Sequence, residues 1–129
     1  MAWSSSQSTN WAWSRRVVLV FDSSECDEAA TELLIRHRTW LRRNDFTTQF
    51  IITQAGPSGN ITATVSWEEA ITALQAGNLP CSGSEASILR LAVSLASTSP
   101  VTLRDIITGL DQANIQLVLN AIRHASGRN

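Results

Sequence analysis

The sequence predicts an α+β fold: a small mixed sheet in the order β-α-β-β, followed by a helical C-terminal layer of about four helices. Two observations support this fold class. The uninterrupted apolar run Val17–Phe21 has the length and composition of a strand that is covered on both faces. The second half of the chain instead contains four segments that begin with a helix-capping residue and continue with helical hydrophobic spacing.

Length and composition indicate one globular domain. A chain of 129 residues is long enough to bury about two thirds of its unfolded surface. We assign residues 15–129 to a single α+β domain and residues 1–14 to a Ser/Trp-rich N-terminal tail, part of which we expect to dock. The formal net charge of −1 argues against broad nonspecific binding to nucleic acid. All ten basic residues are arginines, which excludes lysine-dependent chemistry.

The sequence contains no predicted membrane span or export signal. No segment approaches the roughly 20 consecutive apolar residues of a transmembrane helix. Residues 1–6 lack the basic and apolar regions of a signal peptide. We therefore expect a cytoplasmic protein that makes no membrane contact and keeps Cys26 and Cys81 as reduced thiols.

The apolar run Val17–Phe21 is predicted to be the central strand on which the fold is built. Ser24 and Asp27 then have the spacing of a capping box, and the helix they open is expected to continue to about Asn44. A second strand is predicted within Phe46–Gln54, parallel to the first through a right-handed crossover. The helix between them is expected to face the core with Cys26, Ala30, Leu33, Leu34, His37 and Leu41.

Turn residues and helix caps divide the rest of the chain. Gly56–Asn60 is predicted to be a hairpin turn, and the alternating Ile61–Val65 the second strand of that hairpin. The first of the four later helices is expected to end at Gly77. The second, which runs to about Ser97, is apolar over more than half its circumference and is expected to be central. Capping residues start these helices at Ser66, Ser82, Thr102 and Asp111.

The last helix has two apolar faces, and packing against the core of the domain can bury only one of them. The inward face is expected to consist of Ile115, Val118, Leu119 and Ile122. The second face needs a partner, and we predict that it forms the oligomer interface of a homodimer through Ala113, Leu117 and Ala121.

A candidate ligand site follows the first strand. Asp22, Ser23 and Ser24 lie at its carboxyl end, where open α/β sheets bind their ligands. The structural alternative is that Ser24 caps the helix and Asp22 lies near its positive end. The segment also resembles the start of a von Willebrand A-type metal site, Asp-x-Ser-x-Ser, although Cys26 occupies the place of the second serine.

The other reactive residues show no spacing typical of a metal or catalytic site. The paired spacings of zinc sites are absent, and His37 on an apolar stripe is interpreted as a core histidine. No G-x-S-x-G motif or convergent catalytic set is recognisable. We predict no catalytic residue, no metal ligand and no cofactor; the residues considered were Cys26, His37, Cys81 and His124.

Two features favour a nucleic-acid-binding alternative. Arginines surround a tryptophan near the end of the first helix, a combination that contacts phosphates and stacks on bases. The structural alternative is a solvated helix end whose positive charges suit the helix dipole. In addition, Val101–Ser126 has the rhythm of a helix-turn-helix. The arginine-rich patch consists of Arg36, Arg38, Trp40, Arg42 and Arg43.

The segment Leu79–Gly127 resembles small uncharacterised proteins of high-GC bacteria that carry Leu-Arg-Asp, Gly-Leu-Asp and a later Asn; the first two triplets are Leu103–Asp105 and Gly109–Asp111 here. The resemblance implies no function. The leading hypothesis is a non-catalytic protein-interaction or regulatory module that is homodimeric. The alternatives are a nucleic-acid-binding protein, through the arginine-rich helix or the helix-turn-helix, and an enzyme or small-ligand binder with a pocket beside Asp22.

Overall fold

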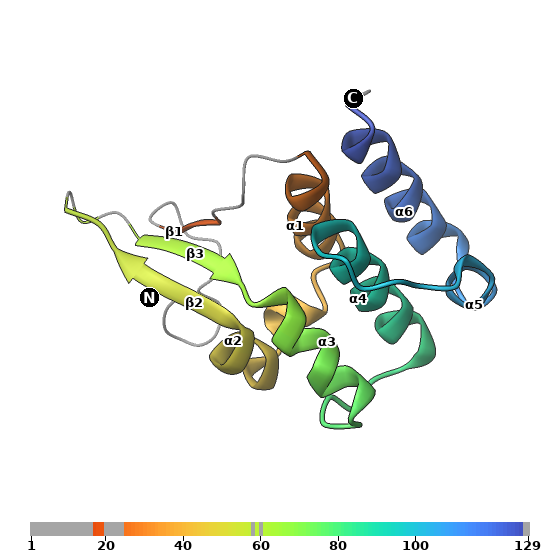
Figure 1. The fold of residues 1–129 in the computed structure, drawn as a ribbon, viewed down its shortest axis with the longest axis horizontal. Helices are drawn as coiled ribbons and strands as arrows, with labels where there is room; N and C mark the ends of the chain where they lie inside the picture. The colour runs from red at the N-terminus through yellow and green to blue at the C-terminus, as the bar shows by residue number, and fades with distance from the viewer. Residues whose placement is uncertain (1–16, 20–24, 58, 60, 128–129) are drawn as a thin grey trace.

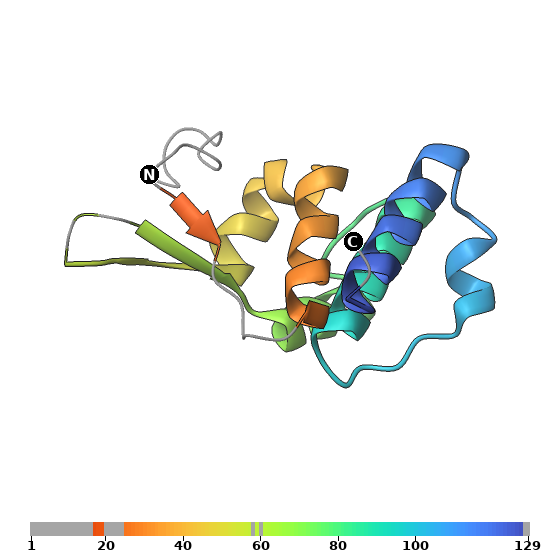
Figure 2. The same cartoon turned by 90° about the horizontal axis from the view of Figure 1, so that it is seen from above.

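The computed structural model describes residues 17–19, 25–57, 59 and 61–127, with only the backbone described for residues 17–19. Helices and strands are both present, so the predicted α+β class is confirmed (Figure 1). The sheet lies at one end of the molecule and most of the helices at the other (Figures 1 and 2). The elements are β1 Val17–Leu19, α1 Glu25–His37, a 3-10 helix Trp40–Arg42, α2 Asn44–Phe50, β2 Ile51–Ala55, β3 Ile61–Val65, α3 Trp67–Gln75, α4 Gly83–Ala96, α5 Leu103–Ile107 and α6 Gln112–Ala125.

The strand order differs from the predicted one. Strand β3, not β1, is in the middle of the order β1-β3-β2. β1 pairs with β3 in parallel, with Val17 opposite Ile61, and β2 pairs with β3 antiparallel, with Ile51 opposite Val65. The predicted parallel crossover from the first to the second strand is therefore wrong, because β1 and β2 run in opposite directions. The hairpin is a local contact that makes β2 and β3 neighbours, which leaves the other edge of β3 for β1.

The segment between α1 and β2 is helical, where the sequence predicted a longer first helix and an earlier strand. Helix α1 ends at His37, and Arg38 has a left-handed backbone with φ 73°. Residues from Asn44 to Phe50 then form α2. A helix brings side chains four residues apart into contact, and the Phe46 and Phe50 ring centroids lie 5.3 Å apart. Trp40 packs on Phe46 at 5.4 Å, so this aromatic cluster stabilises the helical turn.

The hairpin and the end of α3 agree with the prediction. Strands β2 and β3 are joined by the predicted turn, in which Gly59 has φ 84°. After α3, Gly77 adopts φ 80°. Its N–H donates to the Leu74 carbonyl, and the Asn78 N–H donates to the Ala73 carbonyl. This pair of bonds is a Schellman motif, which glycine favours because the left-handed conformation is unstrained without a Cβ.

Helix α4 is central, as predicted. The side chain of Ser82 accepts from the Glu85 N–H, and the Glu85 carboxylate accepts from the Ser82 N–H, so the predicted capping box is present. α4 contacts α1, α3, α5 and α6. Trp40 joins the 3-10 helix to it by donating from Nε1 to the Glu85 carbonyl at 3.0 Å. The buried side chains of α4 are Ala86, Ser87, Ile88, Leu89, Leu91, Ala92 and Val93.

Helix α6 starts where predicted but is rotated relative to the prediction. Asp111 caps it by accepting from the Asn114 N–H at 2.8 Å. Val118 and Ala121 are its buried side chains, whereas Leu119 and Ile122 are 48% and 46% exposed. The oligomer face predicted from the sequence is therefore largely internal. Ala121 is buried, Leu117 packs against the core, and of the three residues only Ala113 is exposed. The small Ala121 lets α6 approach α1 closely, which the larger Leu119 and Ile122 would hinder.

A direct link also joins α1 to α3. Trp67 Nε1 donates to the buried Asp27 carboxylate at 3.0 Å. Asp27 was expected to complete a capping box with Ser24, which lies outside the described residues. Among the helices that the structure describes, none is both long and apolar enough to cross a membrane.

Candidate functional site

A pocket of about 390 Å³ lies between α1 and α6, which pack side by side (Figures 1 and 2). Each helix supplies one wall. The α1 wall is formed by Glu28, Glu32, Leu33 and Arg36. The α6 wall is formed by Leu117, Asn120, Ala121, Arg123 and His124.

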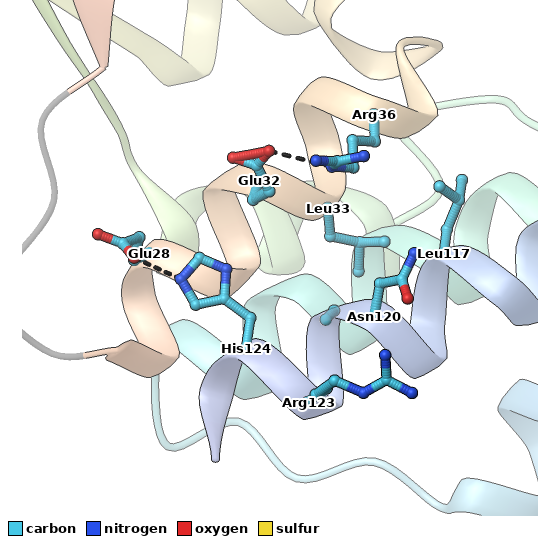
Figure 3. A pocket seen from close by; sticks show the side chains of 9 residues that line it. Glu28, Glu32, Leu33, Arg36, Leu117, Asn120, Arg123 and His124 are labelled. Atoms are coloured by element: carbon cyan, nitrogen blue, oxygen red, sulfur yellow. Dashed lines mark hydrogen bonds and ion pairs between the residues drawn. The ribbon is translucent and has the colours of Figure 1, made fainter. Parts of the chain in front are cut away.

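An ion pair joins the two walls at one end. His124 Nε2 and the Glu28 carboxylate form a short contact although the residues are 96 positions apart in the chain (Figure 3). A carboxylate accepts hydrogen bonds, so Nε2 carries the proton. The other ring nitrogen, Nδ1, lies on the ring edge away from Glu28 (Figure 3) and has no hydrogen-bond partner within the described part of the chain.

A second ion pair lies along the α1 wall. Arg36 Nε donates to Glu32 at 3.0 Å, one helical turn away. Both side chains are exposed, so this pair contributes little to stability. It nevertheless neutralises the second carboxylate of the pocket. Both acidic groups in the walls therefore have a basic partner.

The α6 wall carries two further polar groups, Asn120 and Arg123 (Figure 3). Asn120 accepts a long hydrogen bond from Gln116 at 3.4 Å, which leaves its amide N–H groups available. The Arg123 guanidinium forms no ion pair or side-chain hydrogen bond with any residue that the structure describes. The apolar residues of the pocket lining are Leu33, Leu117 and Ala121.

Sequence reasoning missed most of this pocket. Of its residues, His124 was considered as a zinc ligand, Arg36 as a phosphate contact and Leu117 and Ala121 as interface residues. A signal was available, because Glu28, Glu32 and Arg36 recur every four residues and so share one face of a helix. The sequence does not show that this face meets His124. The predicted ligand residues Asp22, Ser23 and Ser24 lie outside the described residues.

The arginine-rich patch does not form the predicted stacking surface. Trp40 is 0% exposed, so its ring cannot stack on a base in this structure. Arg43 lies over the Trp40 ring at 4.7 Å and donates to Asp45 at 2.5 Å and to the Pro80 carbonyl at 2.7 Å. The Arg43 guanidinium hydrogen-bonds the Asp45 carboxyl and holds the pKa of that group below its ordinary value. The arginines that remain exposed are Arg36, Arg38 and Arg42.

The predicted core histidine and the cysteines are separate from the pocket. His37 is half-buried, its Nδ1 has no partner among the described residues, and burial lowers its pKa from 6.5. Burial raises the pKa of the Cys81 thiol, and the nearby Glu85 carboxylate adds to the effect, so Cys81 is a poor nucleophile. Cys26, predicted to face the core, is exposed instead, and both cysteines are free thiols.

An exposed apolar surface lies on the other side of α6 from the pocket. Residues 115, 119 and 122 are spaced four and three apart, so they form one stripe, which we call the α6 seam. Ile115 is half-buried, and Leu119 and Ile122 are exposed. On α5, immediately before α6 in the chain, Leu103 and Ile107 are 54% and 43% exposed.

Comparisons with known proteins do not connect this arrangement to a family. A scan against protein-family models gave no match, and searches of curated proteins and of solved structures gave no significant match either.

Proposed function

We propose that the protein is a non-catalytic interaction module that forms a homodimer through the α6 seam. The observation that carries this proposal is the exposure of Leu119 and Ile122 at coiled-coil spacing with Ile115. Scattered exposed aliphatic side chains are common, but a stripe along one helix indicates a surface that is covered in the functional state.

The absence of charge along the seam favours a second copy of this chain as the partner. From Gln112 to Ile122, α6 carries no acidic or basic residue. Two identical surfaces therefore meet without like-charge repulsion, whereas a charged partner finds no complementary group. An exposed helix face without charge is also unusual for a surface that remains in water.

The position of the seam within α6 suits a twofold axis. Leu119 is near the middle of Gln112–Ala125, and Ile115 and Ile122 lie on either side of it. In an antiparallel pair, Leu119 packs on its own counterpart, and Ile115 of one copy packs on Ile122 of the other. This orientation also opposes the two helix dipoles and separates the basic C-terminal turns.

The size of the seam limits the affinity. A helix of 14 residues is about 21 Å long, and one such face buries less than the ~1,600 Å² of a standard stable interface. We expect weak, concentration-dependent self-association, to which Leu103 and Ile107 on α5 add apolar area.

Sedimentation velocity over a wide concentration range tests the proposal. The apparent mass is expected to rise from the chain mass of 14.1 kDa towards twice that value. Leu119→Glu should abolish the increase, because it places two charges against each other at the axis. Ile52→Glu is the matched control, since Ile52 is an equally exposed aliphatic residue on β2, and it should dimerise like the wild type.

Two results would contradict the proposal. One is a wild-type protein that keeps the 14.1 kDa mass up to about 1 mM, where even millimolar dissociation constants are visible. The other is a dimer that survives Leu119→Glu, which would place the interface away from the seam.

A further inference from the structure

We propose that the pocket between α1 and α6 binds a small organic monocarboxylate that carries a hydroxyl group on a short apolar body. This site is independent of the proposed dimerisation. The pocket residues Leu117, Ala121 and His124 lie on a different face of α6 from the seam.

The charge pattern selects one negative group. Glu28 and Glu32 are already paired, with His124 and Arg36 respectively. Arg123 is the cationic group of the pocket walls that lacks an acidic partner among the described residues. A guanidinium binds a carboxylate through two parallel hydrogen bonds. A cationic ligand finds no carboxylate without a partner, and a dianion leaves one charge unmatched.

The hydroxyl requirement comes from His124. When His124 forms the ion pair with Glu28, its ring carries a proton on both nitrogens, so Nδ1–H is a hydrogen-bond donor. No described residue accepts from it. The oxygen of a ligand hydroxyl can accept this bond, and the hydroxyl hydrogen can be donated to the side-chain oxygen of Asn120 on the same wall (Figure 3).

The apolar lining and the volume of the pocket define the body of the ligand. Leu33 and Ala121 are 1% and 5% exposed, and Leu117 packs against the core, so the apolar lining is held by the fold. A volume of about 390 Å³ is near the lower end for small-molecule sites. A single ring or a short branched chain matches this space.

Four related probes separate these requirements. 4-Hydroxybenzoate has both the carboxylate and the hydroxyl, and benzoate lacks the hydroxyl. 4-Hydroxybenzamide keeps the hydroxyl but has no charge, and tyramine keeps the hydroxyl but carries a positive charge. We would titrate each into the full-length protein and follow backbone amide resonances by two-dimensional NMR. 4-Hydroxybenzoate is expected to bind with a dissociation constant of about 1 mM, with the largest shifts in α1 and α6. Benzoate should bind about 5-fold more weakly, as for one lost hydrogen bond, and the other two probes should give no saturable shifts.

Variants connect the binding to named groups. Arg123→Gln should weaken 4-hydroxybenzoate binding at least about 10-fold, as for the loss of a charged hydrogen bond. Arg104→Gln is the control, because Arg104 is also an exposed arginine but lies on α5 away from the pocket. In His124→Phe, 4-hydroxybenzoate and benzoate should bind with equal affinity, because both lose the paired state of Glu28 equally and the hydroxyl no longer has its partner. Leu119→Gln should bind like the wild type, which separates this site from the dimer; glutamine is used because a glutamate at 119 would lie one helical turn from Arg123 and pair with it.

Several outcomes would overturn the inference. They are saturable binding of tyramine in place of the acids, unchanged affinity in Arg123→Gln, equal loss in Arg104→Gln, or shifts that map outside α1 and α6. Absence of saturable shifts from 4-hydroxybenzoate up to about 50 mM, far above the expected dissociation constant, would also refute it.

Discussion

Helices α4 and α6 have the same length of 14 residues and similar side-chain caps, but they occupy different environments. α4 has buried side chains around most of its circumference and contacts four other helices. α6 has two buried side chains, Val118 and Ala121, and an apolar seam that faces outward.

The difference shows what hydrophobic pattern can and cannot decide. When apolar residues surround a helix, burial on all sides is the favourable solution and no choice of face remains. When two apolar stripes compete, both cannot contact the same neighbour. The neighbour then selects the stripe whose shape fits, and here α1 selects the side of α6 that contains Ala121.

The largest contrast is expected from the same charge placed in each helix. Leu91→Asp in α4 buries a charge without a partner and should reduce the free energy of unfolding by more than about 3 kcal/mol. Leu119→Asp in α6 should change it by less than about 0.5 kcal/mol at concentrations where the protein is monomeric. Urea denaturation followed by circular dichroism measures both. Comparable losses in the two variants would mean that the seam is part of the monomer core.

The contact of α6 with α1 is tested by adding the same volume at a buried and at an exposed position of the helix. Ala121→Leu should overpack the contact with α1 and destabilise by about 1–3 kcal/mol. Ala113→Leu adds the same atoms at an exposed position near the start of the helix and should have little effect. Thermal unfolding distinguishes the two. If Ala121→Leu were tolerated and Ala113→Leu were not, Ala121 would not be buried against α1 and the contact between α1 and α6 would be wrong.

The start of α6 can be compared with that of α5. Asp111→Ala removes a side-chain cap and should cost about 1 kcal/mol. Thr102→Ala is the matched change, because Thr102 is the N-cap of α5 and makes no side-chain capping bond. Its effect should be at most a few tenths of a kcal/mol, within the range of ordinary surface substitutions. Chemical denaturation resolves the difference, and equal costs would contradict a stabilising bond from the Asn114 N–H to the Asp111 carboxylate.

The smallest expected effect is a pH dependence where α1 ends, near the first turns of α4 and α6. Burial lowers the pKa of His37 from 6.5, against the opposing charges of Glu85 and Asp111. The unfolded chain therefore takes up a proton at higher pH than the folded protein does. This contribution to stability is present above pH 6.5 and is lost as the pH falls through the lower folded pKa.

His37→Gln should remove that part of the pH dependence, because glutamine does not titrate. Denaturation midpoints measured at several pH values on both sides of 6.5 test this expectation. A wild-type protein and a variant with parallel pH profiles would show that His37 has the same pKa in the folded and unfolded chains.

Local signals in the sequence determined where many elements begin and end. Ser82 with Glu85, Asp111 and the glycine at position 77 each stabilise a helix end through bonds to residues close in the chain. The turn between β2 and β3 is equally local. Because both partners of such contacts are nearby in sequence, the pattern contains the complete interaction. The α+β class and the central position of α4 followed from the same kind of reasoning.

Only the tertiary structure decided the rest. Trp40, on which Phe46 packs, is held by a hydrogen bond to the Glu85 carbonyl of α4, so a contact 45 residues along the chain positions the aromatic cluster that follows α1. β3 is the middle strand because β1, which is distant in the sequence, pairs with the edge of β3 that the hairpin with β2 leaves free. The pocket depends on the contact of Glu28 with His124. Each outcome is a choice among near-equivalent local patterns, settled by contacts between residues that are distant in the sequence.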